Sequence, residues 1–198
     1  MNSPLLIIVL FLATNSLAAV AREHSMPVVD GRISYSEVVA VEGASKDELY
    51  ARAKLWIAST LAPSTPLLLD DRENGILLSR GVLQVSENEV AVRTLANTRP
   101  TTVKTWEFTV KIQLREGRYK AELYDIDYTF SMPGNDVGHS PVTRKLDVLF
   151  RDPNMYRRDG TLKDGAPWNI ATWTNDNLNQ LLGSLRSALT EGVTLDDF

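Results

Sequence analysis

Two aspartates near the end of a predicted strand have the clearest potential for chemistry. Asp125 and Asp127 occupy positions where the alternation of that strand predicts apolar side chains. Carboxylates at the edge of a core can have raised pKa values, act as an acid and base in glycoside hydrolysis, or bind a cation. In the alternative interpretation, which we favour, a β-bulge near Tyr124-Asp125 shifts the alternation by one residue and turns both side chains to solvent.

Cationic side chains gather later in the chain, between residues 131 and 168. They stand near Tyr156 and Trp168 and comprise Arg144, Lys145, Arg151, Arg157 and Arg158. A basic cluster with aromatic neighbours can recognise an anion. Acidic residues in the same segment almost balance its charge, which favours ion pairs within the protein. Arg157 and Arg158 remain, with Asp125 and Asp127, the candidate binding residues.

Other catalytic arrangements are absent or incomplete in the sequence. It has no cysteine and only two histidines, His24 and His139, so thiol catalysis and cysteine-based metal sites are excluded. It has no nucleophile elbow, P-loop or dinucleotide-binding glycine motif. The acidic run Asp70–Asn74 lacks calcium-loop spacing and is interpreted as a hairpin turn. We therefore predict no metal, no cofactor and no enzymatic activity.

The first 21 residues contain no charged side chain and predict an export signal. Leu5–Ala13 is an unbroken apolar run, and Ala19-Val20-Ala21 has the form of a cleavage site. Because no Lys or Arg precedes the apolar run, an uncleaved N-terminal anchor is the alternative. Cleavage after Ala21 would give a periplasmic or extracellular protein that is not an integral membrane protein.

Composition predicts one globular domain after the leader. Of 198 residues, 43% are hydrophobic and 23% are charged, with a net charge of −4. This balance argues against a nucleic acid as partner, because phosphate binding needs clustered Lys and Arg. The predicted organisation is a signal peptide at 1–21, an exposed segment at 22–31, and one α+β domain at 32–198. Within that domain, 131–168 is an irregular long connection.

Two amphipathic helices are predicted. The capping box Ser45–Glu48 opens the first, which is about 17 residues long and ends before Pro63. Its apolar stripe comprises Leu49, Ala53, Trp56, Ile57 and Leu61, and Trp56 is predicted to lie in the core. The second is capped by Thr174 or Asn175 and ends near Gly192. Its stripe comprises Leu178, Leu181, Leu182, Leu185 and Leu189.

Strands occupy most of the chain between the helices. The clearest alternates apolar Trp106, Phe108, Val110, Ile112 and Leu114 with polar residues, and turns at Glu116-Gly117 into a return strand. Other predicted strands are 32–42, 67–69, 76–85 with a bulge at Gly81, and 90–95, and residues 142–150 form a short strand or a turn of helix. Burial is most easily satisfied if both helices pack on the same face of one curved antiparallel sheet.

Five motifs follow one another in the chain, namely Ile33–Val39, Gly43–Tyr50, Arg52–Ile57, Asp70–Ile76 with Gly81, and Gly117–Tyr119. Their order and spacing resemble a bacterial exported family known as domain of unknown function 4468, with a TATA-binding-protein-like (TBP-like) fold. The resemblance spans residues 32 to about 130. It implies the same strand-helix-strands-helix arrangement and export from Gram-negative cells. It implies no activity and supplies no catalytic residues.

The sequence thus leads to an exported, non-catalytic binding or interaction domain. Its partner is an unknown protein or envelope component, engaged by the open sheet face, the 131–168 connection, or both. A carboxylate-dependent hydrolase using Asp125 and Asp127 is one alternative. A carrier of a small apolar ligand is another, and it requires a cavity between the helices and the sheet.

Overall fold

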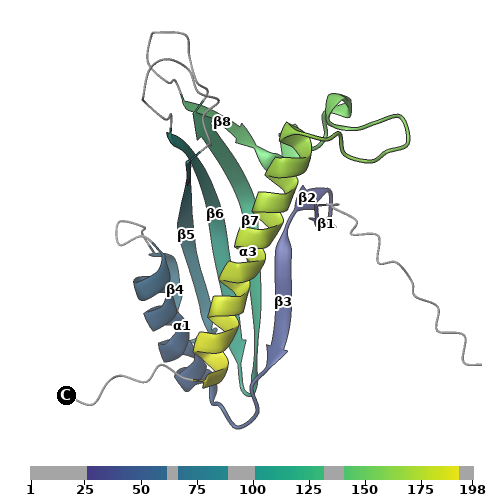
Figure 1. Cartoon of the computed structure of the whole chain (residues 1–198). Coiled ribbons are helices and arrows are strands. Elements are labelled where there is room, and N and C mark those ends of the chain that lie inside the picture. The colour runs from purple at the N-terminus through teal and green to yellow at the C-terminus, as the bar shows by residue number, and fades with distance from the viewer. Residues whose placement is uncertain (1–25, 62–66, 89–100, 132–140, 192–198) are drawn as a thin grey trace, which may run out of the picture.

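The computed structural model describes residues 26–61, 67–88, 101–131 and 141–191, and a twisted six-stranded antiparallel sheet dominates it (Figure 1). The strands lie in the order β3-β7-β6-β5-β4, and β8 pairs with β7 beyond this path. Their bounds are β3 Tyr35–Ala40, β4 Leu67–Asp71, β5 Ile76–Asn88, β6 Thr101–Arg115, β7 Arg118–Ser131 and β8 Pro141–Lys145. A separate hairpin joins β1 (Val28–Val29) to β2 (Arg32–Ile33).

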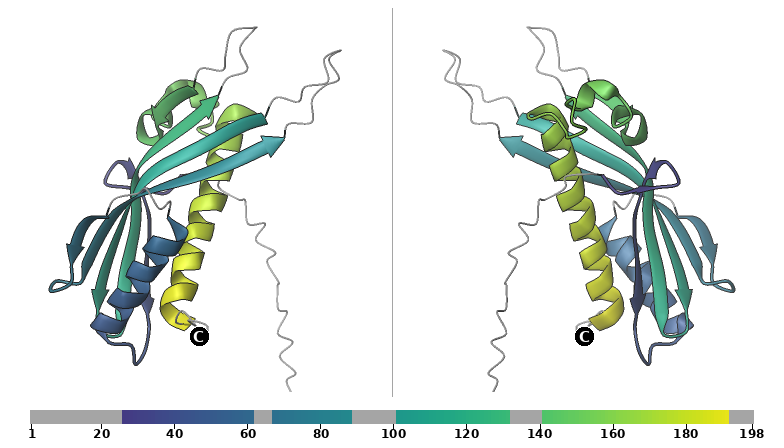
Figure 2. Two further views of the ribbon diagram at one scale, coloured as in Figure 1. Left: turned by 90° about the vertical axis from the view of Figure 1, so that its left-hand side faces the viewer. Right: turned by 90° about the vertical axis from the view of Figure 1, so that its right-hand side faces the viewer.

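Two helices cover one face of the sheet. The side views in Figure 2 show α1 (Lys46–Thr60) and α3 (Ala166–Glu191) on the same side of the strands. A short helix α2 (Leu146–Leu149) and a 3₁₀ turn (Pro153–Met155) lie between β8 and α3. The predicted fold class, one antiparallel sheet with two helices on one face, is confirmed.

The alternation of β6 explains why one face is covered. Trp106, Phe108, Val110, Ile112 and Leu114 are at most 1% exposed and face the helices. The predicted stripe of α3 is buried against the same face, and Trp56 of α1 is 3% exposed. The tryptophans predicted to lie in the core, Trp56 and Trp106, are therefore core residues.

Helix α1 begins where its cap predicts. The Ser45 hydroxyl accepts a hydrogen bond from the Glu48 backbone N–H at 3.2 Å. The reciprocal half of the capping box is not used, because the Glu48 carboxylate accepts from Arg52 one turn along the helix. Asp47 and Glu48 also place negative charge at the positive end of the helix dipole.

The predicted start of α3 is wrong. The helix begins at Ala166 rather than at Thr174 or Asn175, and Gly165 precedes it with φ +85°. Pro167 is tolerated there because the first turn of a helix has backbone N–H groups without intrahelical partners. Thr174 is not a cap but a fully buried residue whose hydroxyl donates to the Ile170 carbonyl at 2.7 Å.

The bulge predicted near Tyr124-Asp125 is confirmed. The β6–β7 register shifts between Glu107 and Thr109, and Asp125 has φ +54°. Ile126 consequently points into the core and is 3% exposed. Tyr124 and Asp127 pair with Thr109 and Glu107, residues that face away from the helices.

The bulge predicted at Gly81 is wrong, because β5 and β6 pair in continuous register from Ile76 to Asn88. Gly81 instead lies opposite Phe108, whose ring fills the space above it. A Cβ added at Gly81 would stand 2.3 Å from the Phe108 Cε2 atom. The glycine therefore admits a large aromatic ring to the core.

Several predictions fall outside the described residues. They are the signal peptide at 1–21, the strand at 90–95, both histidines, Pro63 and Gly192. Within the described part, Met26 is only 8% exposed, and residues 142–150 contain both a strand and a turn of helix. Phe150 closes that segment and is buried.

Candidate functional site

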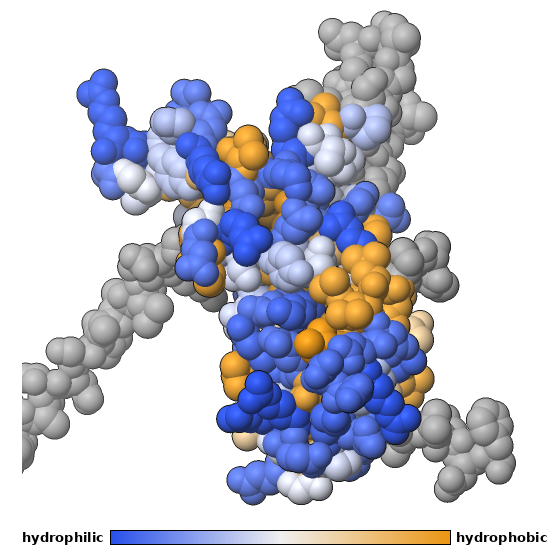
Figure 3. Space-filling model, turned by 180° about the vertical axis from the view of Figure 1, so that it is seen from behind, coloured by the Kyte–Doolittle hydropathy of each residue, from blue (hydrophilic) through white to orange (hydrophobic). Residues whose placement is uncertain are grey.

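The face of the sheet opposite α1 and α3, hereafter the open face, consists of the alternate residues of its strands. Cross-strand pairing aligns them in rows, one of which runs Asp71, Ile76, Gln113, Lys120 and Val38. In the view from behind, Figure 3 shows an apolar region along one side of a largely hydrophilic surface. The open face is therefore chemically divided between apolar and polar halves.

The apolar half lies on β4 and β5. We call it the apolar strip, and it comprises Leu69, Ile76, Leu78 and Val82. The β5 residues of the strip pair with polar Gln113, Lys111 and Glu107 on β6, so the strip is not part of a second core. Leu69 is 43% exposed and neighbouring Leu68 is 52% exposed. Apolar side chains grouped on a face without a helix are typical of a surface that binds a partner.

The polar half contains the two aspartates predicted as candidates, and the structure brings them together with two cations. Lys145 Nζ lies 2.7 Å from Asp125 Oδ1 and 3.9 Å from Asp127 Oδ1. Arg80 lies 3.3 Å from Asp125 and 4.0 Å from Asp127, and it also donates to the Thr109 hydroxyl at 3.1 Å. We call these four charged residues the ion-pair cluster.

The electrostatics of the ion-pair cluster oppose proton donation by Asp125. A hydrogen bond from Lys145 is the largest influence that lowers the Asp125 pKa below its ordinary value, and Arg80 lowers it further. The same contact raises the Lys145 pKa. A glycosidase acid needs a raised pKa, whereas Asp125 is held ionised by its partners. The geometry therefore favours an ion-pair role over the acid of a hydrolase.

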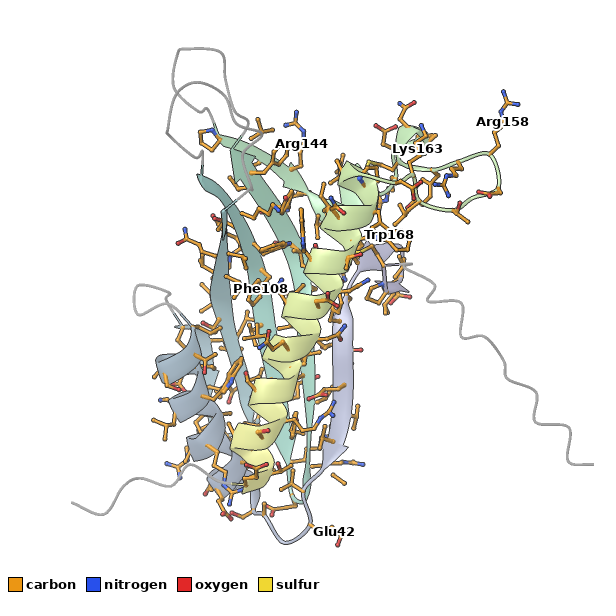
Figure 4. The ribbon with its side chains drawn as sticks, in the orientation of Figure 1. Glu42, Phe108, Arg144, Arg158, Lys163 and Trp168 are labelled. Carbon is orange, nitrogen blue, oxygen red and sulfur yellow. The ribbon has the colours of Figure 1, made fainter. Side chains whose placement is uncertain are left out.

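Arg157 and Arg158, the other candidates, lie elsewhere in the molecule. Arg157 forms a salt bridge with Asp164, and Arg158 extends from the outer tip of the segment between the 3₁₀ turn and α3 (Figure 4). Neither reaches the ion-pair cluster. Tyr156 in the same segment donates to the Phe150 carbonyl at 2.8 Å, which ties the segment to α2.

The hairpin turn predicted in the acidic run at 70–74 is present but begins later, because Asp70 and Asp71 still belong to β4 and pair with Leu77 and Ile76. Asp71 accepts hydrogen bonds from the Asn74 backbone at 3.0 Å and the Asn74 side chain at 2.8 Å, and these bonds lower its pKa. Asp70 instead accepts from Tyr50 and pairs with Lys54 of α1 at 2.7 Å. Both carboxylates thus have partners within the protein. Gly75 closes the turn with φ +66°.

A pocket of about 210 Å³ that the sequence analysis did not predict lies at the β6–β7 hairpin end of the open face. Its lining residues come from β3, β6 and β7, and are Val38, Gln113, Arg115, Arg118, Tyr119 and Lys120. The signal for it was present, since the predicted turn at Glu116-Gly117 places Arg115 directly opposite Arg118. The adjacency of β3 to β7 was not predictable from that turn.

A second hollow, of about 360 Å³, lies between β3 and α3. Its lining mixes Tyr35 and Leu182 with polar Ser36, Asn175 and Asn179. The Tyr35 hydroxyl donates to Asn175 at 2.5 Å, and burial raises the Tyr35 pKa. Such a mixed lining does not match the apolar cavity that a carrier requires.

Two further features are absent from the described part of the chain. No group of three or more potential metal-ligating side chains occurs among those residues. No helix within them has the length and apolar character needed to cross a membrane.

The fold and the open face define an α+β domain of TBP-like architecture. Residues 35–129 match the family described as "Domain of unknown function (DUF4468) with TBP-like fold", which confirms the resemblance seen in the sequence motifs. The matched residues cover the first helix and most of the sheet, and the description of the family names no activity.

Two solved structures share the fold. A TBP-like protein from Parabacteroides distasonis ATCC 8503 has 19% identity and a TM-score of 0.57, with 83% of this chain and 96% of that chain covered. A DUF4468 family protein from Bacteroides ovatus ATCC 8483 has 17% identity and a TM-score of 0.61, with 87% and 94% covered. No curated protein matches the chain.

Proposed function

We propose that this protein is an exported, non-catalytic domain that binds a protein partner of the cell envelope through its open face. The observation that carries the proposal is the apolar strip. Leu69, Ile76 and Leu78 stand together on a sheet face that neither α1 nor α3 covers, and Val82 follows on the same face beyond Arg80. Apolar side chains in such a place gain free energy when a partner removes them from water.

The charges beside the strip support a binding role. Asp125 and Asp127 are engaged by Arg80 and Lys145, which leaves a neutralised surface rather than an acid–base pair. Paired charges around an apolar centre resemble the polar rim of a protein interface. The proposal of export rests on the uncharged leader and its Ala19-Val20-Ala21 motif.

The experiment compares two matched leucine-to-lysine variants. Leu69→Lys places a charge within the apolar strip, whereas Leu55→Lys does so on α1, and the two leucines are 43% and 37% exposed. Wild type and both variants are immobilised and exposed to envelope extract from the producing cell. Retained proteins are identified by mass spectrometry, and the dissociation constant of the purified partner is then measured.

We expect wild type and Leu55→Lys to retain the same partner and Leu69→Lys to lose it. Retention by all three proteins, or the absence of any specific partner, would contradict the proposal. Export is tested separately by fractionating cells and sequencing the mature N-terminus, where Arg22 is the expected first residue. Recovery of the chain in the cytosol with an intact leader would refute export.

A further inference from the structure

The pocket at the β6–β7 hairpin end of the open face has an unusual charge arrangement. Arg115 and Arg118 are register partners beside the turn of the β6–β7 hairpin, and both are exposed. Like charges in this position repel, so cross-strand pairs of this kind destabilise a sheet. Among the described residues, no salt bridge joins either guanidinium to a carboxylate. A cation pair of this kind is stabilised when an anion binds between its members.

A third cation stands beside the pair. Lys120 lines the pocket one row further along the sheet and pairs with Glu122 at 2.7 Å. Glu122 also lies 3.9 Å from Lys111, so this carboxylate is shared between two lysines. The remaining acid of the hairpin, Glu116, is exposed in the turn. The pocket is thus locally cationic in a chain whose net charge is −4.

The pocket also has an apolar wall and an apolar neighbour. Val38 of β3 lines it and is 67% exposed. Gln113 lines it from β6 and is the register partner of Ile76 in the apolar strip. An extended segment crossing the strands along this row would meet Ile76 on β5, Gln113 on β6 and the cation Lys120 on β7, and Arg118 lies on β7 in the next row of the same face. A ligand suited to the row therefore carries an acidic group close to an apolar one.

From these contacts we infer that Arg115, Arg118 and Lys120 bind a carboxylate side chain of an acidic-apolar segment in the protein partner, while Ile76 and its neighbours take the adjacent apolar side chain. The guanidinium fork matches a planar carboxylate in two parallel hydrogen bonds, which gives Arg its advantage over Lys. The inference deepens the proposed function and rests on the open face being the binding surface.

The test uses the full mature chain and a short capped peptide in which glutamate and leucine alternate. A matched peptide carries glutamine in place of glutamate. Binding is followed by nuclear magnetic resonance of the arginine Nε–H groups, with inorganic phosphate and acetate titrated as separate arms. We expect saturable shifts at Arg115 and Arg118 with the glutamate peptide, and binding of the glutamine peptide about ten-fold weaker or worse.

Two double variants remove the same charge from different places. Arg115→Gln/Arg118→Gln is expected to weaken the glutamate peptide about ten-fold or more, whereas Arg157→Gln/Arg158→Gln is expected to leave its affinity unchanged. The double variant Arg115→Lys/Arg118→Lys keeps both charges and provides an independent measurement if the glutamine variant does not fold. It is expected to bind the glutamate peptide more weakly than wild type, because lysine lacks the forked guanidinium group.

The inference is overturned if both peptides bind alike, if both glutamine double variants weaken binding equally, or if phosphate binds the pocket more tightly than the glutamate peptide. The first outcome denies a role for the carboxylate, the second indicates non-specific attraction, and the third assigns the pocket to a different anion. Each leaves the proposed function intact if Leu69→Lys still loses the envelope partner. If one of these peptide outcomes occurs and Leu69→Lys also keeps the envelope partner, the inference and the proposed function are both refuted.

Discussion

A hydrogen bond between α3 and the centre of the sheet provides a quantitative test of the fold. The indole N–H of Trp106 donates to the Thr174 hydroxyl at 2.9 Å, and both side chains are 0% exposed. Thr174→Val keeps the shape of the side chain but removes the acceptor. The buried N–H is then left without this partner, which costs about 1–3 kcal/mol in free energy of unfolding.

The measurement is urea unfolding followed by circular dichroism. With a slope of about 2 kcal/mol/M, the expected loss moves the midpoint down by about 0.5–1.5 M without changing the slope. Thr190→Val is the control, because Thr190 lies on the same helix, is exposed, and bonds only to carbonyls of its own helix. We expect the control to stay within about 0.5 kcal/mol of wild type.

A double-mutant cycle separates the pair from its surroundings. Trp106→Phe alone creates a cavity and destabilises the protein for that reason as well. Combined with Thr174→Val, the cycle is expected to give a coupling energy of about 0.5–3 kcal/mol. If Thr174→Val were as stable as wild type, or if the coupling energy were zero, the third turn of α3 would not dock on the sheet as described.

Two further predictions concern glycines and the ion-pair cluster. Gly81→Ala places a methyl group against the Phe108 ring and is expected to lower the free energy of unfolding by about 1–3 kcal/mol. Gly183 of α3 has open space around it, so Gly183→Ala is expected to raise the free energy of unfolding by about 0.5–1 kcal/mol. Urea midpoints that shift in the same direction for both variants would contradict this expectation. The Asp125 pKa is lowered in the folded protein, so its stabilising contribution is present above the ordinary value of 3.8 and is lost as pH falls through the folded value. Asparagine tolerates the φ of +54° at this position, so Asp125→Asn tests the charge alone. We expect this variant to have a lower free energy of unfolding than wild type at neutral pH, and the difference between the two proteins to become smaller in acid. A difference that does not change with pH would argue against the pairing with Lys145.

The parts of the fold that local patterns specify were predictable. Ser45 and the stripe behind it located α1, and the slip in alternation after Leu123 located the bulge at Asp125. These signals are local because a cap and a pleat involve residues close in sequence. The direction of both aspartates follows from the bulge alone, since shifting the register by one residue exchanges the faces of a strand.

The beginning of α3 was missed because a polar residue was interpreted as a cap. Ile170, Thr174 and Leu178 are spaced by four, which continues the apolar stripe backwards and could have revealed the extra turns. What the sequence does not reveal is why a threonine is tolerated there. Its partner Trp106 lies 68 residues away in the chain and is brought to it only by the fold.

The candidate site was predictable in its chemistry but not in its assembly. Asp125 was singled out from β7 alone, yet its partners come from β5 and β8, so the sequence could not show that Arg80 and Lys145 neutralise it. The same holds for the arginine pair, because the turn predicts that Arg115 meets Arg118 but not that Val38 of β3 completes a pocket beside them.

The two ends of the open face differ in how their charged side chains are paired. At the β8 end, Asp125 is engaged by both Arg80 and Lys145, so a partner's charged group would have to displace a salt bridge to bind there. At the hairpin end, Arg115 and Arg118 are register partners of the same charge, and no carboxylate of the described residues forms a salt bridge with either, so a partner's carboxylate displaces no ion pair when it binds there. The apolar strip on β4 and β5 lies beside these two ends and does not distinguish between charged groups of a partner. An extended partner is therefore expected to place its acidic residue at the hairpin and its apolar residue over β5, an orientation that the glutamate and glutamine peptides distinguish.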